Sequence, residues 1–289
     1  MVFDKYNGTD TKFTVPAYRD GTPVTEIAPK AFLSCKTIRK LIIPDTVTHI
    51  GDWAFAHMKN LEELVIPFHR ISYGKKVFLD CGHLKKIEVS GRSGDKEGIA
   101  YFLASVITIL KKDILWSPER AEDKRWQGGW MKAYDEAVEE YLTAPDEEGF
   151  EPVFIGWFND EDADVQRPRY LEQKQKDKIR LVLQRLLYPE FLSADRKAVL
   201  QAYLADHMPD GRCREEHTWV ADMICDERME YHNDVRYLKI LEESGCLNSN
   251  NIKILLEALS DSNPEMAAYL LRLSGRGSEN GDFFQSLEL

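Results

Sequence analysis

The feature that most constrains the fold is a repeat of 23 residues near the start of the chain. The segment from Val24 to Phe32 returns at Val47 to Phe55 with Val-Thr, Ile and Ala-Phe at matching positions. Further apolar columns continue into a third unit: Phe32/Phe55/Phe78, Cys35/Met58/Cys81, Ile38/Leu61/Leu84, Leu41/Leu64/Ile87 and Ile43/Ile66/Val89. A fixed period of about 20–29 residues with this apolar spacing is typical of a solenoid, whose coils bury their inward side chains only by stacking. The sequence therefore predicts stacked parallel strands at Leu41 to Ile43 and its copies.

The repeated pattern I-x-x-x-A-F-x-x-C-x-x-L-x-x-L-x-I-P resembles the BspA-type leucine-rich repeat. The resemblance covers residues 13–90 and includes a degenerate first coil, Phe13 to Pro16, with a turn at Asp20-Gly21 after it. The third unit departs from the pattern, since Val77 replaces Ala and Ser90 replaces Pro. The resemblance implies a short leucine-rich-repeat solenoid that binds other proteins and, in many bacteria, is displayed at the cell surface.

Charge and composition predict two domains, residues 1–98 and residues 99–289. The first part holds 15 Lys and Arg against 12 Asp and Glu, and the remainder holds 23 against 37, so the net charge changes from +3 to −14. The segment Ser90 to Gly98 is rich in Gly, Ser and charged residues, which is the usual composition of a domain boundary. The expected fold class is α+β: a solenoid followed by an acidic all-α domain.

An apolar period of 3.6 residues predicts helices throughout the second domain. The apolar faces comprise Trp126/Trp130/Tyr134/Ala137/Val138/Tyr141, Ile179/Val182/Leu183/Leu186/Leu187 and Val199/Tyr203/Leu204. The expected helix starts are Ser117-Pro118-Glu119, Ser193 and Asn263-Pro264-Glu265, where a capping side chain precedes the first turn. Three short helices at residues 235–244, 251–259 and 264–273 resemble a helical-repeat array of the ankyrin kind, although the T-P-L-H-x-A signature is missing.

The last coil of a solenoid leaves an apolar end that needs a cover. The longest apolar stretch of the chain, Ile99 to Leu110, begins directly after the predicted boundary. We expect this segment to dock on the last coil as a helix. It is too short to span a bilayer.

The cysteines of the chain could in principle form a disulfide or, with nearby histidines, bind a metal. Cys35 and Cys81 occupy one repeat column two coils apart, a separation near 10 Å that excludes a disulfide, so both are expected to be small buried residues. Cys213 and His217 are four residues apart on a predicted helix, with Cys225, Asp226 and His232 downstream. Because no C-x-x-C pair or zincin motif completes the set, no metal is assigned, and a buried Cys beside a surface His is the favoured interpretation.

Other chemistries are disfavoured by spacing and charge. The acidic run Asn159 to Asp164 lacks the Gly and the final Glu of a calcium loop. An overall pI near 5.2 argues against nucleic-acid binding. The sequence contains no nucleophile elbow, phosphate-binding loop or dinucleotide motif, so neither an enzyme activity nor a cofactor is expected. The aromatic face Trp126/Trp130/Tyr134/Tyr141 is interpreted as core, with a carbohydrate or partner platform as the alternative.

The leading functional hypothesis is a non-catalytic interaction protein with a protein partner. The outward positions of the predicted strands form a candidate binding strip: Lys40, Ile42, Glu63, Val65, Lys86 and Glu88. An ordinary solvated sheet face is an equal alternative. Along this face Lys40, Glu63 and Lys86 are expected side by side as a cross-strand charge ladder.

Two further hypotheses remain open. The resemblance implies a bacterial cell-surface adhesin or host-interaction protein, whereas the N-terminal residues lack a signal sequence and favour a cytoplasmic protein. An enzyme would need an unrecognised site in the helical domain. The sequence leaves open the identity of the partner, the oligomeric state and which domain binds.

Overall fold

The computed structural model describes residues 1–67, 69, 71–90, 97–111, 129–150, 161–208, 235–259 and 263–277. Contacts divide the chain into two compact units, Met1–Glu148 and Gly149–Leu289. The predicted boundary after residue 98 lies within the first unit, at the change from strands to helices.

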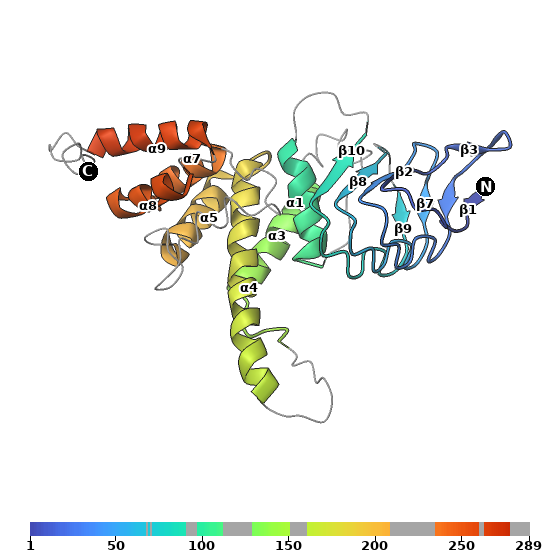
Figure 1. The fold of residues 1–289 in the computed structure, drawn as a ribbon, viewed down its shortest axis with the longest axis horizontal. Coiled ribbons are helices and arrows are strands. Elements are labelled where there is room, and N and C mark those ends of the chain that lie inside the picture. Colours follow the sequence, from blue (N-terminus) through green and yellow to red (C-terminus); the bar gives the residue numbers. More distant parts are fainter. Residues whose placement is uncertain are drawn as a thin grey trace. The chain divides into compact units, whose positions relative to one another are not determined.

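The first unit begins with a solenoid that carries two parallel sheets of four strands each (Figure 1). Sheet A contains, in spatial order, β1 (Val2–Phe3), β5 (Glu26–Ile27), β7 (His49–Ile50) and β9 (Ser72–Tyr73). Sheet B contains β2 (Lys12–Thr14), β6 (Lys40–Ile42), β8 (Glu63–Ile66) and β10 (Lys86–Val89). Each coil gives one strand to each sheet, so the predicted solenoid with parallel strands is confirmed.

The pairing register of the strands confirms the 23-residue period. In sheet B, Lys40 pairs with Glu63 and Glu63 with Lys86, which places residues one period apart directly side by side. Phe13 pairs with Leu41, as expected for a degenerate first coil. The hairpin β3 (Tyr18–Arg19) and β4 (Thr22–Pro23) encloses the predicted turn, where Asp20 and Gly21 have φ angles of 50° and 74°.

The core of the solenoid consists of the predicted apolar columns. Leu41, Leu64 and Ile87 are buried one above another in sheet B, because alternate residues of a strand face the interior. The ring centroids of Phe32 and Phe55 lie 5.7 Å apart, and those of Phe55 and Phe78 lie 5.5 Å apart. The aromatic column is therefore continuous across three coils.

Tight turns join the two sheets on one side of each coil, and they repeat in conformation as well as in sequence. Lys30, Trp53 and Lys76 have φ angles of 61°, 59° and 52°, in the left-handed region that bulky residues rarely occupy. Each turn is bonded to the next coil: the Lys30 N–H donates to the Asp52 carbonyl over 2.9 Å, and the Trp53 N–H to the Lys75 carbonyl over 3.0 Å. The hydrogen bonds between stacked coils thus hold these residues in a backbone conformation that is unfavourable for them in isolation.

Helix α1 (Glu97–Thr108) covers the end of the solenoid and packs against β10, which confirms the helix predicted for Ile99 to Leu110. Its buried residues include Tyr101, Phe102 and Leu103. The Phe102 ring meets Tyr134 of helix α3 (Gly129–Thr143) edge-on, with centroids 6.2 Å apart. The hydrophobic core of the first unit therefore continues from the last coil into helices α1 and α3.

The second unit is helical throughout its described parts, as predicted. It contains α4 (Glu161–Leu187), α5 (Ala194–His207), α7 (Val235–Glu243), α8 (Ser249–Leu259) and α9 (Pro264–Gly277). Helix α9 extends four residues beyond the predicted end at Leu273. Helices α4 and α5, α4 and α7, and α8 and α9 pack against each other.

Two of the predicted helix starts carry the expected caps. Ser193 Oγ accepts the Arg196 N–H over 3.2 Å, and Asn263 Oδ1 accepts the Met266 N–H over 3.0 Å. The predicted start at Ser117-Pro118-Glu119 lies outside the described residues. Both observed caps satisfy backbone donors that a helix leaves unpaired at its first turn.

One predicted apolar face of the helical unit is wrong. Val199 was assigned to the buried face of α5, but its relative exposure is 58%. The buried residues of this helix are Leu200 and Leu204, four residues apart. Helical spacing also links Val199 to Tyr203, and only packing against other helices decided between the two overlapping stripes. The faces predicted at Ile179/Val182/Leu183 and at Tyr134/Val138 are buried, whereas Trp126 and the Trp130 side chain lie outside the description.

Candidate functional site

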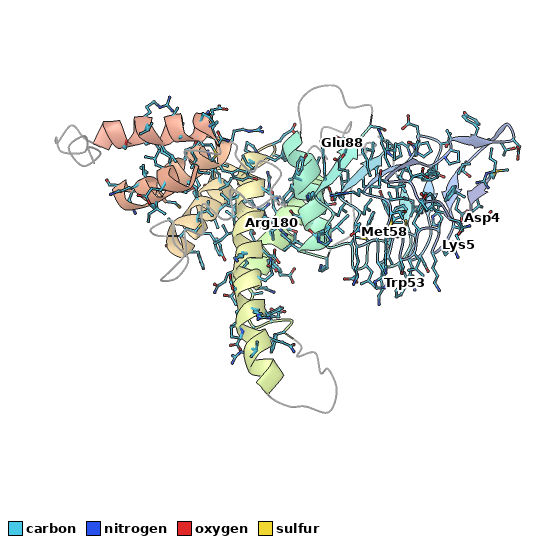
Figure 2. All side chains as sticks on the ribbon, viewed as in Figure 1. Asp4, Lys5, Trp53, Met58, Glu88 and Arg180 are labelled. Carbon is cyan, nitrogen blue, oxygen red and sulfur yellow. The ribbon has the colours of Figure 1, made fainter. Side chains whose placement is uncertain are left out.

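All six residues of the predicted strip project from the outer face of sheet B, in two rows that cross the strands. One row contains Lys40, Glu63 and Lys86, and the other contains Ile42, Val65 and Glu88. Each of them is half-buried rather than fully exposed, because neighbours on adjacent strands shield its base. Glu88 lies at the end of the strip where β10 meets helix α1 (Figure 2).

The charged side chains of the strip pair with one another. Lys40 Nζ donates to Glu63 Oε2, and Lys86 Nζ lies 2.6 Å from Glu88 Oε1. The Lys86 ammonium also lies 5.5 Å from the centroid of the Tyr101 ring in α1. The predicted side-by-side arrangement of Lys40, Glu63 and Lys86 is confirmed by the register. With Glu88, the strip holds two positive and two negative charges, which sum to zero.

The hydrogen bond from Lys86 lowers the pKa of Glu88 below its usual value, and the charge of Lys40 acts in the same direction. Burial opposes this shift but is the smaller effect. Because the pKa is lowered, the ionised Glu88 stabilises the folded state. This stabilisation is fully present at pH values above the ordinary pKa of a glutamate, and it is lost as the pH falls through the lowered pKa. At neutral pH Glu88 is therefore an anion fixed beside its lysine.

Internal pairing leaves Ile42 and Val65 as the apolar centre of the strip. They are direct partners in the β6–β8 register, and Thr14 and Glu88 continue the row on either side. An apolar centre with a polar surround is the anatomy of protein–protein contact surfaces.

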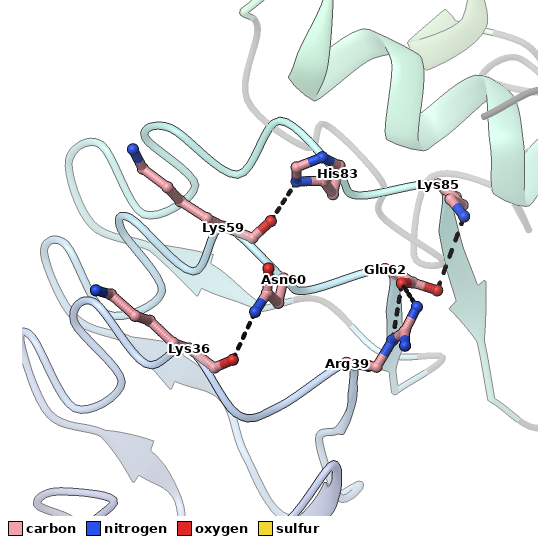
Figure 3. A network of polar contacts seen from close by, with 7 residues as sticks. All are labelled: Lys36, Arg39, Lys59, Asn60, Glu62, His83 and Lys85. Atoms are coloured by element: carbon pink, nitrogen blue, oxygen red, sulfur yellow. Dashed lines mark hydrogen bonds and ion pairs between the residues drawn. The ribbon is translucent and has the colours of Figure 1, made fainter. Parts of the chain in front are cut away.

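A second set of polar side chains follows the loops that lead into sheet B (Figure 3). Glu62 receives a hydrogen bond of 2.8 Å from Arg39 Nε, and its other oxygen lies 3.8 Å from Lys85 Nζ. Asn60 Nδ2 donates to the Lys36 carbonyl over 2.7 Å, and His83 contacts the Lys59 carbonyl in the same way one coil later. These contacts join successive coils. This network was not predicted, although the charges of Arg39, Glu62 and Lys85 alternate in sign at the repeat interval.

The cysteines of the solenoid are free thiols. Cys81 is buried, its Sγ donates to the Phe55 carbonyl over 3.1 Å, and burial raises its pKa to about 12. The expectation that Cys35 is also buried is wrong: it is half-buried, and its Sγ lies 3.4 Å from Thr37 Oγ1. A protonated thiol with a raised pKa is a poor nucleophile, so Cys81 belongs to the core.

The alternative hypotheses of an enzyme site and of a metal site both concern the helical unit. In the described residues of the chain, no three His, Cys, Asp or Glu side chains come together as a metal site. The candidates Cys213, His217, Cys225, Asp226 and His232, and the side chains of the acidic run at residues 159–164, lie outside the description. Tyr269 donates to Glu242, and burial, with this bond, raises the Tyr269 pKa to about 12.

The repeat geometry agrees with a known family. A family model described as BspA type Leucine rich repeat region matches residues 11–102, in six copies. Residues 11–102 are a BspA-type leucine-rich repeat region. The match begins after β1 and ends within α1, so it covers the remaining strands of both sheets and the predicted strip but does not extend to the helical unit. Leucine-rich repeat regions generally mediate protein–protein interaction and are generally non-catalytic.

Two solved structures share this similarity over part of their length. A leucine-rich cell surface protein from Faecalibacterium prausnitzii A2-165 is 28% identical, with a TM-score of 0.25 over 30% of this chain and 26% of that one. A leucine-rich repeat protein of T. pallidum is 26% identical, with a TM-score of 0.25 over 31% of this chain and 56% of that one. The aligned part thus spans less than two thirds of either protein. No curated protein matches the chain.

A helix that crosses a membrane must be both long and apolar. None of the helices in the described parts of the chain combines the length and the apolar character that crossing a bilayer requires. The longest of them, α4, carries charged residues along its length.

Proposed function

We propose that the protein is a non-catalytic binding module whose leucine-rich repeat region contacts a protein partner through the outer strip of sheet B. The observation that carries the proposal is the alignment of Ile42 and Val65, with the ion pair Lys40–Glu63 alongside them and the ion pair Lys86–Glu88 at one end of their row. A partner gains apolar burial at the centre and meets charges that are already neutralised, so few ions lose water without compensation.

The rigidity of the strip supports the same use. Strands β6 and β8 are joined to neighbours on both sides within the sheet, and β10 is joined to β8. The loops before these strands are linked from coil to coil by Glu62, Asn60 and His83. A preorganised surface loses little conformational entropy when a partner binds. Helix α1 covers the end of the sheet at β10 and limits the strip on that side.

The variant Val65→Arg tests the proposal. The side chain projects outward, so the core remains intact while the apolar centre becomes charged. Full-length tagged protein, wild type and variant, is used to capture proteins from a lysate of the bacterium that encodes it, with quantitative mass spectrometry as the readout. We expect a partner that is enriched on the wild type and at least tenfold depleted on Val65→Arg.

The matched control is Val199→Arg, which introduces the same charge at an exposed valine of α5. It should retain the partner at the wild-type level. Equal capture by wild type and Val65→Arg, with hydrogen exchange showing sheet B intact in both, contradicts the proposal that the strip is the contact surface.

The location of the protein is part of the proposal. We place it in the cytoplasm, where the reduced thiols Cys81 and Cys246 would persist. Fractionation of cells that carry an epitope-tagged chromosomal copy tests this. Recovery of the tag in the cell-surface fraction contradicts the placement and supports an adhesin.

A further inference from the structure

The turns on the other side of the coils carry a surface that the strip does not include. Figure 2 shows Trp53 projecting from the edge of the solenoid opposite to Glu88. This turn face is defined here by Lys30, Leu33, Trp53, Lys76 and Leu79. Lys30/Trp53/Lys76 is one repeat column, and Leu33 and Leu79 occupy the outer positions of another.

Apolar side chains on the turn face are exposed in a regular pattern. Leu33 and Leu79 have relative exposures of 39% and 38%, whereas Ala56, which occupies the same column between them, is fully buried. The column therefore presents two exposed leucines, one coil on either side of a fully buried alanine. Trp53 lies in the same turn as Ala56, whose N–H donates to the Trp53 carbonyl over 3.1 Å.

Trp53 is held outward at a conformational cost. Its φ angle of 59° is unusual for a bulky residue, and its side chain is half-exposed although the chain has a large apolar core. Lys30 and Lys76 share this left-handed conformation, so the repeated turn places the side chains of the whole column on the outside. Tryptophan is also among the residues most enriched at energetic centres of protein interfaces.

Charge on the turn face indicates what binds there. Lys30 and Lys76 flank Trp53 along the column, both exposed, and Lys76 Nζ lies 5.4 Å from the centroid of the indole ring. The nearest acid in sequence, Asp52, already accepts the Lys75 backbone N–H over 2.8 Å. An aromatic side chain between two ammonium groups complements an apolar residue between carboxylates.

We propose that the turn face binds an extended acidic peptide segment of another protein. A large apolar side chain of that segment packs against Trp53 between Leu33 and Leu79, and acidic residues on either side pair with Lys30 and Lys76. Lys30 and Lys76 lie two coils apart, roughly 10 Å, which about three residues of an extended chain span, so acids on both sides of the apolar residue reach both lysines. This surface is separate from the strip on sheet B, and neither proposal depends on the other.

Peptide selection on the intact protein tests the inference. Random 12-residue peptides displayed on phage are selected against the immobilised full-length chain, and the enriched sequences are synthesised with a fluorescein label. We expect enriched peptides that carry one or two large apolar residues among Asp and Glu. Trp53→Asn should weaken their binding at least tenfold, and because Asn tolerates the left-handed conformation, the variant should keep the wild-type exchange pattern.

The charge requirement is tested with matched pairs of reversals. Lys30→Glu combined with Lys76→Glu should weaken binding at least tenfold. Lys12→Glu combined with Lys36→Glu changes the net charge equally at exposed lysines elsewhere on the solenoid, and it should leave binding within twofold. Equal loss in both pairs overturns the proposal in favour of general electrostatic attraction.

Four other outcomes overturn the turn-face site. Enriched peptides without acidic residues, or no enrichment at all, overturn the inference. Peptides that bind Trp53→Asn as well as the wild type overturn it too. Peptides that lose binding in Val65→Arg and keep it in Trp53→Asn sit on the strip of sheet B, which overturns the turn-face site while supporting the proposed function.

Discussion

Replacing Phe55 by alanine should lower the free energy of unfolding of the solenoid by about 3–5 kcal/mol. Phe55 is fully buried, and its ring lies between those of Phe32 and Phe78 at 5.7 and 5.5 Å. Truncation removes apolar burial and leaves a cavity that the neighbouring coils cannot close, since backbone hydrogen bonds fix their spacing. Hydrogen exchange of peptides that cover β6 to β8 reports the change without interference from the helical unit.

Phe55→Leu is the conservative control and should cost less than about 1.5 kcal/mol, because it keeps most of the apolar volume. Phe78→Ala should cost less than Phe55→Ala, since Phe78 is only half-buried at the last turn. A loss below about 1 kcal/mol for Phe55→Ala contradicts a continuous aromatic column.

Replacing Gly51 by alanine should destabilise the solenoid by about 3 kcal/mol, through a different mechanism. An added Cβ would lie 2.5 Å from the Pro29 nitrogen and 2.9 Å from the Ala28 carbonyl carbon, both backbone atoms of the preceding coil. Backbone atoms cannot move aside without breaking the hydrogen bonds between coils. Gly74, one period later, would meet Asp52 in the same way, at 2.6 Å from its nitrogen.

Gly82→Ala provides the matched control, because its added Cβ would meet no atom within 4 Å. It should be neutral or stabilise slightly by restricting the unfolded chain. The measurement is again amide exchange in the two sheets. Gly51→Ala and Gly82→Ala with equal stability would contradict the close approach of successive coils.

The solenoid could be predicted from the sequence because every apolar column repeats independently at the same 23-residue interval. Apolar residues such as Leu41, Leu64 and Ile87 recur in register, and only stacking buries them all. Sheet A was not predicted, since its strands are two residues long, as in Glu26–Ile27, and too short for an alternating pattern. The left-handed turns at Lys30 and Trp53 were missed because no glycine marks them.

What could be predicted of the candidate sites, and what could not, has similar physical causes. The strip on sheet B followed directly from alternation along the strands, and Lys40 does face Glu63. The pairing of Lys86 with Glu88 within one strand depends on side-chain conformations that sequence does not specify. Lys30 and Lys76 at the repeat positions of Trp53 indicate an outward column, but the sequence does not specify the left-handed turn that holds the indole there.

The most direct test of the stacked arrangement is disulfide formation between engineered cysteines, in a chain whose five native cysteines are replaced by alanine. Lys40→Cys with Glu63→Cys places thiols on adjacent paired strands, about 4.8 Å apart, whereas Lys40→Cys with Lys86→Cys places them about 10 Å apart, beyond the reach of a disulfide. Mild oxidation followed by mass spectrometry should show an internal crosslink in the first variant and free thiols in the second. Crosslinking of the second variant in preference to the first would contradict coils stacked at the 23-residue interval.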